Sequence, residues 1–272
     1  MDQLVLKGGN ALDLIYQVST RASIDVDMSI ESQFSDFPRF TKRVATSLSS
    51  TFKKHGYYVF DVTVSEVPSS ISEDAKAFWG GYKIEFKLAK NNVHMKFRSD
   101  LPNLRRNAEV VGPAQRRKFK IDISKHEYCN SKRAVELLGY RVFVYSPELL
   151  VLEKLRALCQ QLPEYESIVP SPNRRPRARD FVDIHALVEK LQLNFCTPEC
   201  VAILREVFEA KRVPVGWLLR IGECLDYHSG DFPSVTATVH PGVQLFDFDY
   251  YFNYVVTLSN RLHAYWMEQP PT

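Results

Sequence analysis

Two aspartates near the start of this 272-residue sequence, Asp25 and Asp27, are its strongest candidates for chemistry. They lie in the segment 23–28 (Ser-Ile-Asp-Val-Asp-Met), where polar and apolar residues alternate with the period of a β-strand. Because successive strand side chains point to opposite faces, both carboxylates should point the same way. Hard divalent cations prefer oxygen ligands, so the pair predicts a shared metal site.

A double glycine stands upstream of these aspartates. Gly8 and Gly9 follow Lys7 and precede a short predicted helix for which Asn10 is a candidate N-cap. Glycines before a helix let backbone N–H groups approach phosphate oxygens, and the helix N-terminus adds positive potential. A double glycine alone is a weak signal, but its order and distance relative to an Asp-x-Asp strand make the combination specific.

Phosphoryl or nucleotidyl transfer usually needs a third carboxylate on a neighbouring strand. Asp122 fits that requirement, because it lies in the strictly alternating segment 118–123. Two metal ions held by the three aspartates would stabilise the attacking and the leaving oxygen of an in-line displacement. Asp122 could also take the proton from an attacking hydroxyl.

The surrounding pattern predicts the elements that position these residues. Strand and helix signals alternate up to about residue 145, and helical signals dominate after it. Further strands are expected at 57–64, 81–88, 118–123 and 141–145. Helices are expected at 36–54, 149–162, 179–191, 198–210 and 246–266. The segment 164–177 is rich in proline, serine and arginine and predicts an exposed loop. The aromatic segment 246–252 is typical of helix-packing core rather than a base-stacking platform.

Five segments, taken in order, resemble the AbiEii-type toxin nucleotidyltransferases of the DNA polymerase β-like superfamily. They are Lys7–Gly9, Arg21–Asp27, Lys120–Asp122, Glu153–Leu158 and Arg179–Asp183. The resemblance runs from residue 7 to about residue 190. It implies an α/β fold in which a mixed-sheet nucleotidyltransferase domain, residues 1–145, is followed by a mainly helical domain, residues 146–272, that completes the active-site cleft.

The resemblance also implies roles for single residues. The nucleotide would be bound by Lys7, Gly8, Gly9, Arg21, Ser23, Lys154 and Asp183. Mg²⁺ or Mn²⁺ would be bound by Asp25, Asp27 and Asp122. The catalytic set would be Asp25, Asp27, Asp122, Lys154 and Asp180. Asp180 and Asp183 share a helix face, and an exposed acidic helix edge remains an alternative for them. We expect Lys154 and Asp180 to face a solvated cleft.

The reaction implied by the resemblance is Mg²⁺-dependent transfer of a nucleoside monophosphate from an NTP to an acceptor hydroxyl. The biological setting would be a toxin–antitoxin or phage-defence pair with a separate antitoxin protein. Three basic clusters, at 105–106, 116–118 and 174–177, favour an RNA acceptor, because phosphate contacts position a nucleic acid. Some members of the family act on transfer RNA, which makes tRNA the leading acceptor.

Other functions remain open at this point. The enzyme could nucleotidylate a protein or make a nucleotide signal, or the chain could be a non-catalytic RNA-binding relative. The carboxylates argue against a binding protein, which gains nothing from acids that face phosphates.

The overall composition is compatible with each of these predicted functions. The net charge of +3 permits an anionic partner without demanding one. No apolar run approaches the roughly 20 residues that span a bilayer, so we expect no membrane partner. Five cysteines are sparse and odd in number, which indicates reduced thiols in a cytoplasmic protein. A zinc site at Cys196 and Cys200 is disfavoured, because Thr197-Pro198 reads as a helix start.

Overall fold

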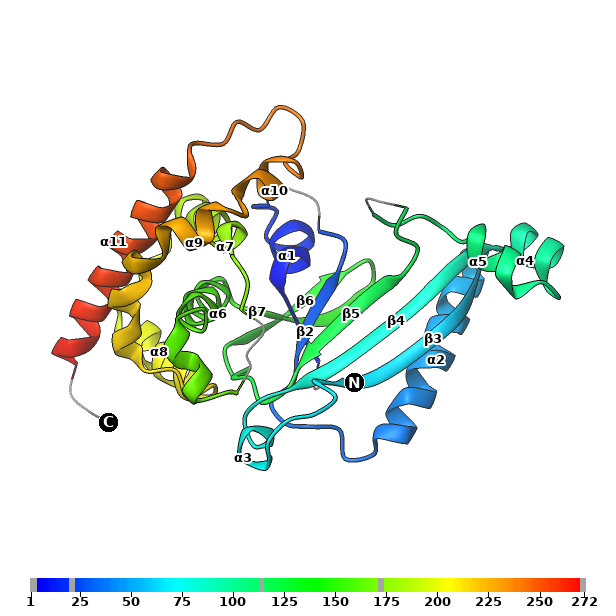
Figure 1. Ribbon diagram of the computed structural model, residues 1–272, viewed down its shortest axis with the longest axis horizontal. Helices are drawn as coiled ribbons and strands as arrows, with labels where there is room; N and C mark the ends of the chain where they lie inside the picture. Colours follow the sequence, from blue (N-terminus) through cyan, green and yellow to red (C-terminus); the bar gives the residue numbers. More distant parts are fainter. Residues whose placement is uncertain (1–3, 20–22, 113–114, 171–173, 270–272) are drawn as a thin grey trace.

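The computed structural model describes residues 4–19, 23–112, 115–170 and 174–269. Its centre is a seven-stranded sheet in the order β3-β4-β5-β2-β1-β7-β6 (Figure 1). The strands are β1 (Val5–Lys7), β2 (Val26–Ser29), β3 (Tyr57–Val67), β4 (Gly81–Lys90), β5 (Phe119–Ser124), β6 (Lys132–Leu137) and β7 (Tyr140–Tyr145). The β2–β5 and β1–β7 pairs are parallel and the other pairs are antiparallel. This mixed sheet confirms the α/β fold expected from the sequence.

Strands β3, β4 and β5 form a wing of the sheet that one long helix covers on one face. Helix α2 (Phe37–Lys54) packs there against the apolar side chains of β4, among them Ile84 and Phe86. Asp36 caps α2 by accepting a hydrogen bond from the Arg39 N–H at 2.8 Å. The short helices α4 (Asn91–Phe97) and α5 (Leu101–Arg106) lie at the far end of this wing (Figure 1), whereas Ala75 of α3 (Glu73–Lys76) packs with buried residues of the helices after residue 146.

The second half of the chain is helical, as expected, and lies beside the β1-β7-β6 end of the sheet (Figure 1). Its elements are α6 (Pro147–Cys159), η2 (Pro163–Ser167), α7 (Ala178–Leu191), α8 (Pro198–Glu209), η3 (Val215–Cys224), α9 (Leu225–Ser229), α10 (Phe232–Thr236) and α11 (Phe248–Glu268). One hydrophobic cluster joins Val5 and Val144 of the sheet to Leu155, Phe181 and Phe252 of these helices. The helical half therefore packs directly on the strands that carry the site.

The prediction that the aromatic segment 246–252 is core is confirmed in part, since Phe246 and Tyr250 are exposed. Phe248, Tyr251 and Phe252 of α11 are buried. The Phe252 ring stacks on Phe181 of α7 with ring centroids 5.3 Å apart. No helix in the described ranges is long and apolar enough to span a membrane. All five cysteines are free thiols.

Three local expectations are corrected by the structure. Asn10 does not cap a helix: α1 (Gly8–Asn10) begins at the glycines and continues into a π-helical turn, η1 (Ala11–Ile15), because the Asn10 amide instead donates to the Asp25 carbonyl at 2.6 Å. Strand β2 begins only after Asp25. The segment after residue 163 is not a plain exposed loop, since Tyr165 is fully buried and its hydroxyl donates to the Lys211 carbonyl at 3.0 Å.

Candidate active site

The centre of the candidate site is a row of charged residues that crosses four strands. Strand register places Lys7 of β1 opposite Asp27 of β2, Asp27 opposite Asp122 of β5, and Asp122 opposite Lys83 of β4. Directly opposite residues on neighbouring strands have their side chains on the same face. The fold therefore brings Asp27 and Asp122 side by side with a lysine beyond each. Lys83 was not identified from the sequence, because nothing there gives the order of the strands.

The glycine turn lies against one of these carboxylates. Gly8 has a φ of +66°, a conformation in which side chains are strained. A Cβ on Gly8 would overlap Oδ2 of Asp27. The adjoining backbone is tied down by the Asp25 carbonyl, which accepts hydrogen bonds from the Asn10 amide at 2.6 Å and from the Ser23 hydroxyl at 3.5 Å. The predicted phosphate-binding turn thus lies next to Asp27.

The third expected metal ligand, Asp25, forms an ion pair with an arginine. Arg116, just before β5, binds both carboxylate oxygens: Nη2 lies 2.7 Å from Oδ1, and Nη1 lies 3.3 Å from Oδ2. The sequence assigned Arg116 to a basic cluster for RNA. No sequence signal links it to Asp25, which is 91 positions away.

The pair of Asp27 and Asp122 fits a hard cation, while the full set of three does not assemble in this conformation. Within the described ranges no group of three or more His, Cys, Asp or Glu side chains is placed to hold a metal ion, and Asp25 is paired with Arg116. Asp27, in contrast, has no hydrogen bond or ion pair in the described part of the chain. Burial raises its pKa to about 6; Lys7 opposes this shift and Asp122 adds to it. A divalent cation between the two carboxylates would satisfy both.

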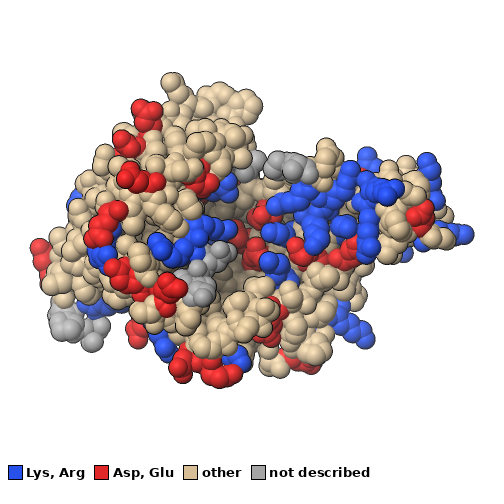
Figure 2. Space-filling view, viewed as in Figure 1, with Lys and Arg blue, Asp and Glu red and all other residues tan. Residues whose placement is uncertain are grey.

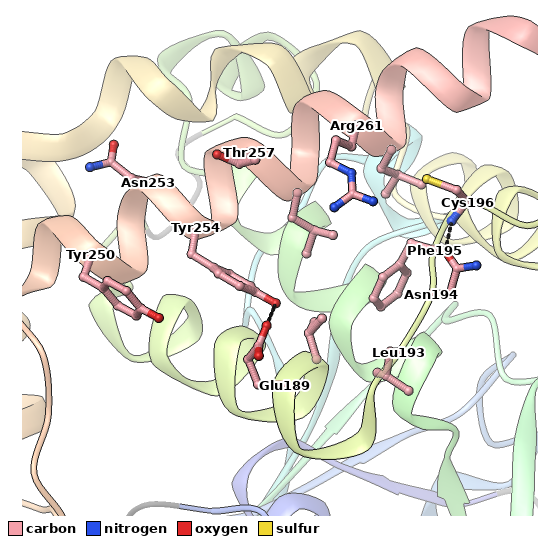
Figure 3. A pocket seen from close by; sticks show the side chains of 13 residues that line it. Glu189, Leu193, Asn194, Phe195, Cys196, Tyr250, Asn253, Tyr254, Thr257 and Arg261 are labelled. Carbon is pink, nitrogen blue, oxygen red and sulfur yellow. Dashed lines mark hydrogen bonds between the residues drawn. The ribbon is translucent and has the colours of Figure 1, made fainter.

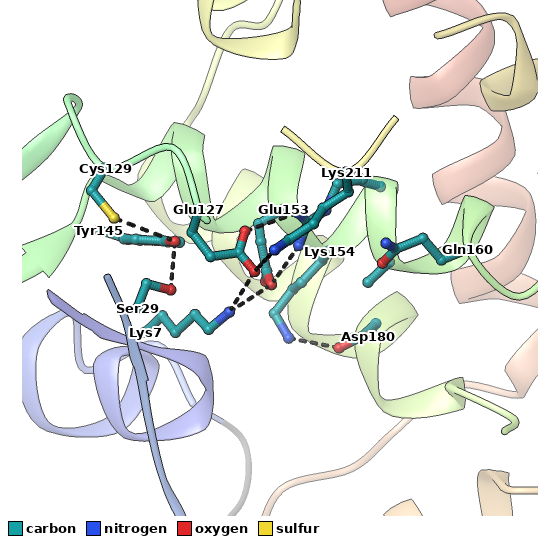
Figure 4. Close-up of polar contacts among 12 residues, drawn as sticks. Lys7, Ser29, Glu127, Cys129, Tyr145, Glu153, Lys154, Gln160, Asp180 and Lys211 are labelled. Carbon is teal, nitrogen blue, oxygen red and sulfur yellow. Dashed lines mark hydrogen bonds and ion pairs between the residues drawn. The ribbon is translucent and has the colours of Figure 1, made fainter. Parts of the chain in front are cut away.

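A buried network of charges joins the sheet to the helical half behind this row (Figure 4). Lys7 Nζ lies 3.0 Å from a Glu153 oxygen and 3.7 Å from a Glu127 oxygen. Glu127 is also paired with Arg156 at 2.8 Å and with Lys211 at 3.5 Å. Burial lowers the pKa of Lys7, but the two glutamates prevail and hold it above its usual value. The Lys7 amine is therefore held within the protein.

Lys154 of α6 and the two aspartates of α7 form a second buried cluster. Lys154 Nζ lies 2.7 Å from Asp180 Oδ1 and 2.8 Å from Asp183 Oδ2, and Arg177 pairs with the other oxygen of Asp180. Lys154, Asp180 and Asp183 are only 5%, 5% and 2% exposed. Burial would raise the pKa of Asp180, but Arg177 and Lys154 hold it well below its usual value.

This arrangement corrects two expectations from the sequence. Lys154 and Asp180 do not face a solvated cleft, and the aspartate pair is not an exposed helix edge. The i, i+3 spacing did place Asp180 and Asp183 on one face, but that face of α7 packs against α6. A buried lysine requires a partner of opposite charge, and the two carboxylates supply it.

The remaining sequence-predicted residues divide into two groups. Arg21 lies outside the described residues. Several residues of the basic clusters have partners within the protein: Arg105 is paired with Asp61 at 2.8 Å, and Arg174 Nε donates to the Gln161 carbonyl at 2.8 Å. Part of the basic character is therefore internally satisfied.

A pocket of about 460 Å³ lies elsewhere, between α11 and the C-terminal end of α7 with the segment that follows it (Figure 3). Phe195, Tyr254 and Arg261 are among its lining residues. Its lining contains no residue of the charged row and none that the sequence assigned to the site.

The chain was compared with solved structures, curated proteins and family models. Among solved structures, the chain is similar to a candidate nucleotidyltransferase from H. pylori, with 16% identity and a TM-score of 0.49 over 98% of this chain and 90% of that one. It is also similar to JHP933 from Helicobacter pylori, with 16% identity and a TM-score of 0.47 over 96% and 86% of the two chains. An antigenic nucleotidyltransferase-like protein from Paracoccidioides brasiliensis gives 15% identity and a TM-score of 0.31 over 78% and 84%.

Curated protein sequences give no match. The family itself is shown by a model described as the nucleotidyl transferase AbiEii toxin of a type IV toxin–antitoxin system, which matches residues 1–239. Because that match spans most of the sequence, the chain belongs to the AbiEii family of nucleotidyltransferase toxins.

Proposed function

We propose that this nucleotidyltransferase moves a nucleoside monophosphate from an NTP to a hydroxyl of RNA in a reaction that depends on Mg²⁺ or Mn²⁺. The observation that carries the proposal is the pairing of Asp27 with Asp122 beside the Gly8 turn. It combines two acids that have no partner among the described residues, which suit a metal–triphosphate, with a backbone turn that suits phosphate oxygens.

Asp27 and Asp122 would hold the divalent cation, and Asp25 would join them after parting from Arg116. Bound there, the metal would neutralise charge on the triphosphate and on the attacking oxygen. Release of Asp25 is feasible, because its ion pair is partly exposed: the side chains of Arg116 and Asp25 are 31% and 37% accessible. Partly exposed pairs of this kind contribute only about 0–1 kcal/mol.

The chain's own residues would divide the reaction between binding and proton transfer. Backbone N–H groups of Gly8 and Gly9 would bind the triphosphate. Arg21 and Ser23, which precede Asp25 in the sequence, would add contacts to the nucleotide. Asp122 would accept the proton as the acceptor oxygen bonds to the α-phosphorus. The bond from that phosphorus to the bridging oxygen then breaks, and pyrophosphate leaves.

Lys7, Lys154, Asp180 and Asp183 would act mainly by position and charge. The amines of Lys7 and Lys154 are each held by two carboxylates. Both also lower the pKa of Asp27, so their charge reaches the carboxylate row. In this proposal residues 1–145 carry the chemistry, and residues 146–272 hold these charges in place and complete the cleft.

The leading acceptor is transfer RNA, as the family resemblance suggested. An antitoxin is implied by the toxin–antitoxin family. We expect the enzyme and its antitoxin to act in the cytoplasm, the compartment that free thiols favour.

The test of this function is incubation of the purified protein with each α-labelled NTP, Mg²⁺, and either total RNA or total protein. We expect label on RNA, abolished by EDTA and by Asp122→Asn. Label only on protein, or on a small nucleotide product, would replace the RNA assignment; no transfer with any NTP would overturn the proposal.

A further inference from the structure

The face of the β3–β4–β5 wing opposite α2 is open and basic. On β4, Tyr82, Ile84 and Phe86 point into the core beneath α2, so the alternate residues Lys83, Glu85 and Lys87 lie on the other face. Figure 2 shows lysine and arginine side chains gathered over this part of the molecule, with acidic side chains between them and the helical half.

The charges on this face do not balance. Lys87 and Arg105 share Asp61, at 2.9 and 2.8 Å, and Lys118 pairs with Glu85 at 3.1 Å. Lys83 and Lys120 are left over: neither has a hydrogen-bond or ion-pair partner in the described part of the chain. The face therefore carries an excess of positive charge, and its two unpaired amines are free to bind an anion.

These two lysines lie next to the carboxylate row. Lys83 is the direct cross-strand neighbour of Asp122. Lys120 is two residues before Asp122 on β5, so it shares the face. At a strand spacing of about 4.8 Å, both amines can reach anionic groups beside the proposed proton acceptor.

The two ends of the row differ in what they can bind. On the β1 side of Asp27 lie the Gly8 turn and Lys7, whose amine is already held by Glu153. On the β4 side of Asp122 lies Lys83, whose amine has no partner within the described ranges. A donor triphosphate at the glycine turn leaves the β4 side for the other substrate.

We propose that the open face of β4 and β5, through Lys83 and Lys120, binds the phosphate backbone of the RNA acceptor and directs its hydroxyl toward Asp122. This inference rests on the proposed function and adds the docking site of the second substrate. Lysines that contact phosphates position a nucleic acid without reading its sequence. The face accordingly contributes affinity and orientation, and acceptor selection depends on other contacts.

The test compares Lys83→Ala/Lys120→Ala with Lys42→Ala/Lys53→Ala. The control removes the same two charges from exposed positions of α2, on the opposite face of the wing. Bulk transfer RNA is the probe, and its dissociation constant is measured without NTP at several salt concentrations. Steady-state transfer then gives separate KM values for RNA and NTP.

For the Lys83/Lys120 variant we expect RNA affinity to fall about tenfold and the slope of log K against log salt to lessen by about 1.4, the effect of two lost contacts to single-stranded phosphates. The KM of this variant for RNA should rise while its KM for NTP stays at the wild-type value. The control variant should keep the wild-type RNA affinity and both wild-type KM values. Unchanged RNA affinity and salt slope, in a protein whose wild type labels RNA, would overturn the docking site alone. A wild type that neither binds nor labels RNA would overturn the proposed acceptor, and this inference with it.

Discussion

Two groups of acidic and basic side chains, one in the helical half and one in the sheet, differ in how completely their charges are paired. In the helical half, Lys154 is bound by Asp180 and Asp183 and is almost completely buried. In the sheet, Asp27 and Asp122 lie side by side with no partner in the described residues.

The difference shows how residue type alone misleads. Both groups contain aspartates and lysines, yet Asp180 and Asp183 are ion-paired with Lys154, whereas Asp27 and Asp122 form no ion pair with any described residue. Paired buried charges hold elements together, whereas adjacent unpaired carboxylates cost free energy until a cation or proton arrives. The sheet group is therefore the place where a ligand is needed.

The largest expected effect is the loss of activity when Asp27, one of the two adjacent carboxylates of the sheet, is changed. Asp27→Asn should reduce kcat/KM by at least about 10³-fold, because it removes a proposed metal ligand where charge must be stabilised. Its melting temperature should stay equal or rise, since the variant removes a like charge beside Asp122. Transfer assays and thermal denaturation measure the two quantities, with Asp249→Asn on the exposed side of α11 as the control. Near-normal transfer would remove Asp27 from the site.

The next effect is on stability, at the paired group. Lys154→Met should lower the free energy of unfolding by about 3–5 kcal/mol, because it leaves two buried carboxylates without their partner. Denaturant unfolding measures this, and Lys42→Met, on exposed α2, should cost less than about 0.5 kcal/mol.

The same variant also tests whether the buried group reaches the chemistry. Assayed at a temperature where Lys154→Met remains folded, kcat/KM should fall about 10²-fold if the charge of Lys154 supports the transition state. A Lys154→Met variant with wild-type stability and normal transfer would contradict both the structural and the electrostatic role of Lys154.

A smaller effect is the pH dependence of stability that comes from His228, which lies beside the Lys154–Asp180–Asp183 cluster. His228 is buried and accepts a hydrogen bond from the Arg177 N–H at 3.1 Å. Burial lowers its pKa to about 4, with Asp180 and Asp231 opposing the shift and Arg177 adding to it. The folded state then binds fewer protons than the unfolded state between pH 4 and an unfolded pKa of about 6.5. Stability from this group is complete above pH 6.5 and is lost as pH falls toward 4.

We expect that loss to reach up to about 3 kcal/mol, at about 1.4 kcal/mol per pKa unit. His228→Asn keeps an acceptor for Arg177 but cannot be protonated, so it serves as the comparison. Urea unfolding of both proteins from pH 4.5 to 7.5 should give a difference that changes steadily across this range. Parallel curves would show that His228 does not titrate there. The Asp27 contribution is common to both proteins and cancels.

The smallest expected effect concerns Arg116, which competes for Asp25. Arg116→Ala should tighten Mn²⁺ binding about 1.4- to fivefold, because a partly exposed ion pair worth roughly 0.2–1 kcal/mol no longer has to break. Electron paramagnetic resonance of free Mn²⁺ measures this without any turnover. Arg116→Lys, which keeps the charge but loses the two-pronged contact, should lie between wild type and alanine. Weaker Mn²⁺ binding in Arg116→Ala would mean that Arg116 instead positions Asp25 for the metal.

Much of the fold could be predicted from local signals. Helix α2 follows its Asp36 cap, and α6 begins with Ser146 as cap followed by a proline and an acid, an order typical of helix starts. The long strands β3 and β4 follow their alternation. Strands β1 and β6 were missed: β1 has only three residues, and the charged residues in β6 hide its alternation. Such segments become strands because their neighbours pair with them.

The sequence by itself determined which residues are chemically able to act: an Asp-x-Asp pair, a glycine turn and a third aspartate in an alternating segment. Only the tertiary structure decided which of them meet and how they are charged. It set Asp122 beside Asp27, gave Asp25 to Arg116, and buried Lys154 between two acids. The reason is physical. Side-chain type and local spacing are written in the chain, but the energy of a charge depends on burial and on partners that strand order and helix packing bring from distant positions.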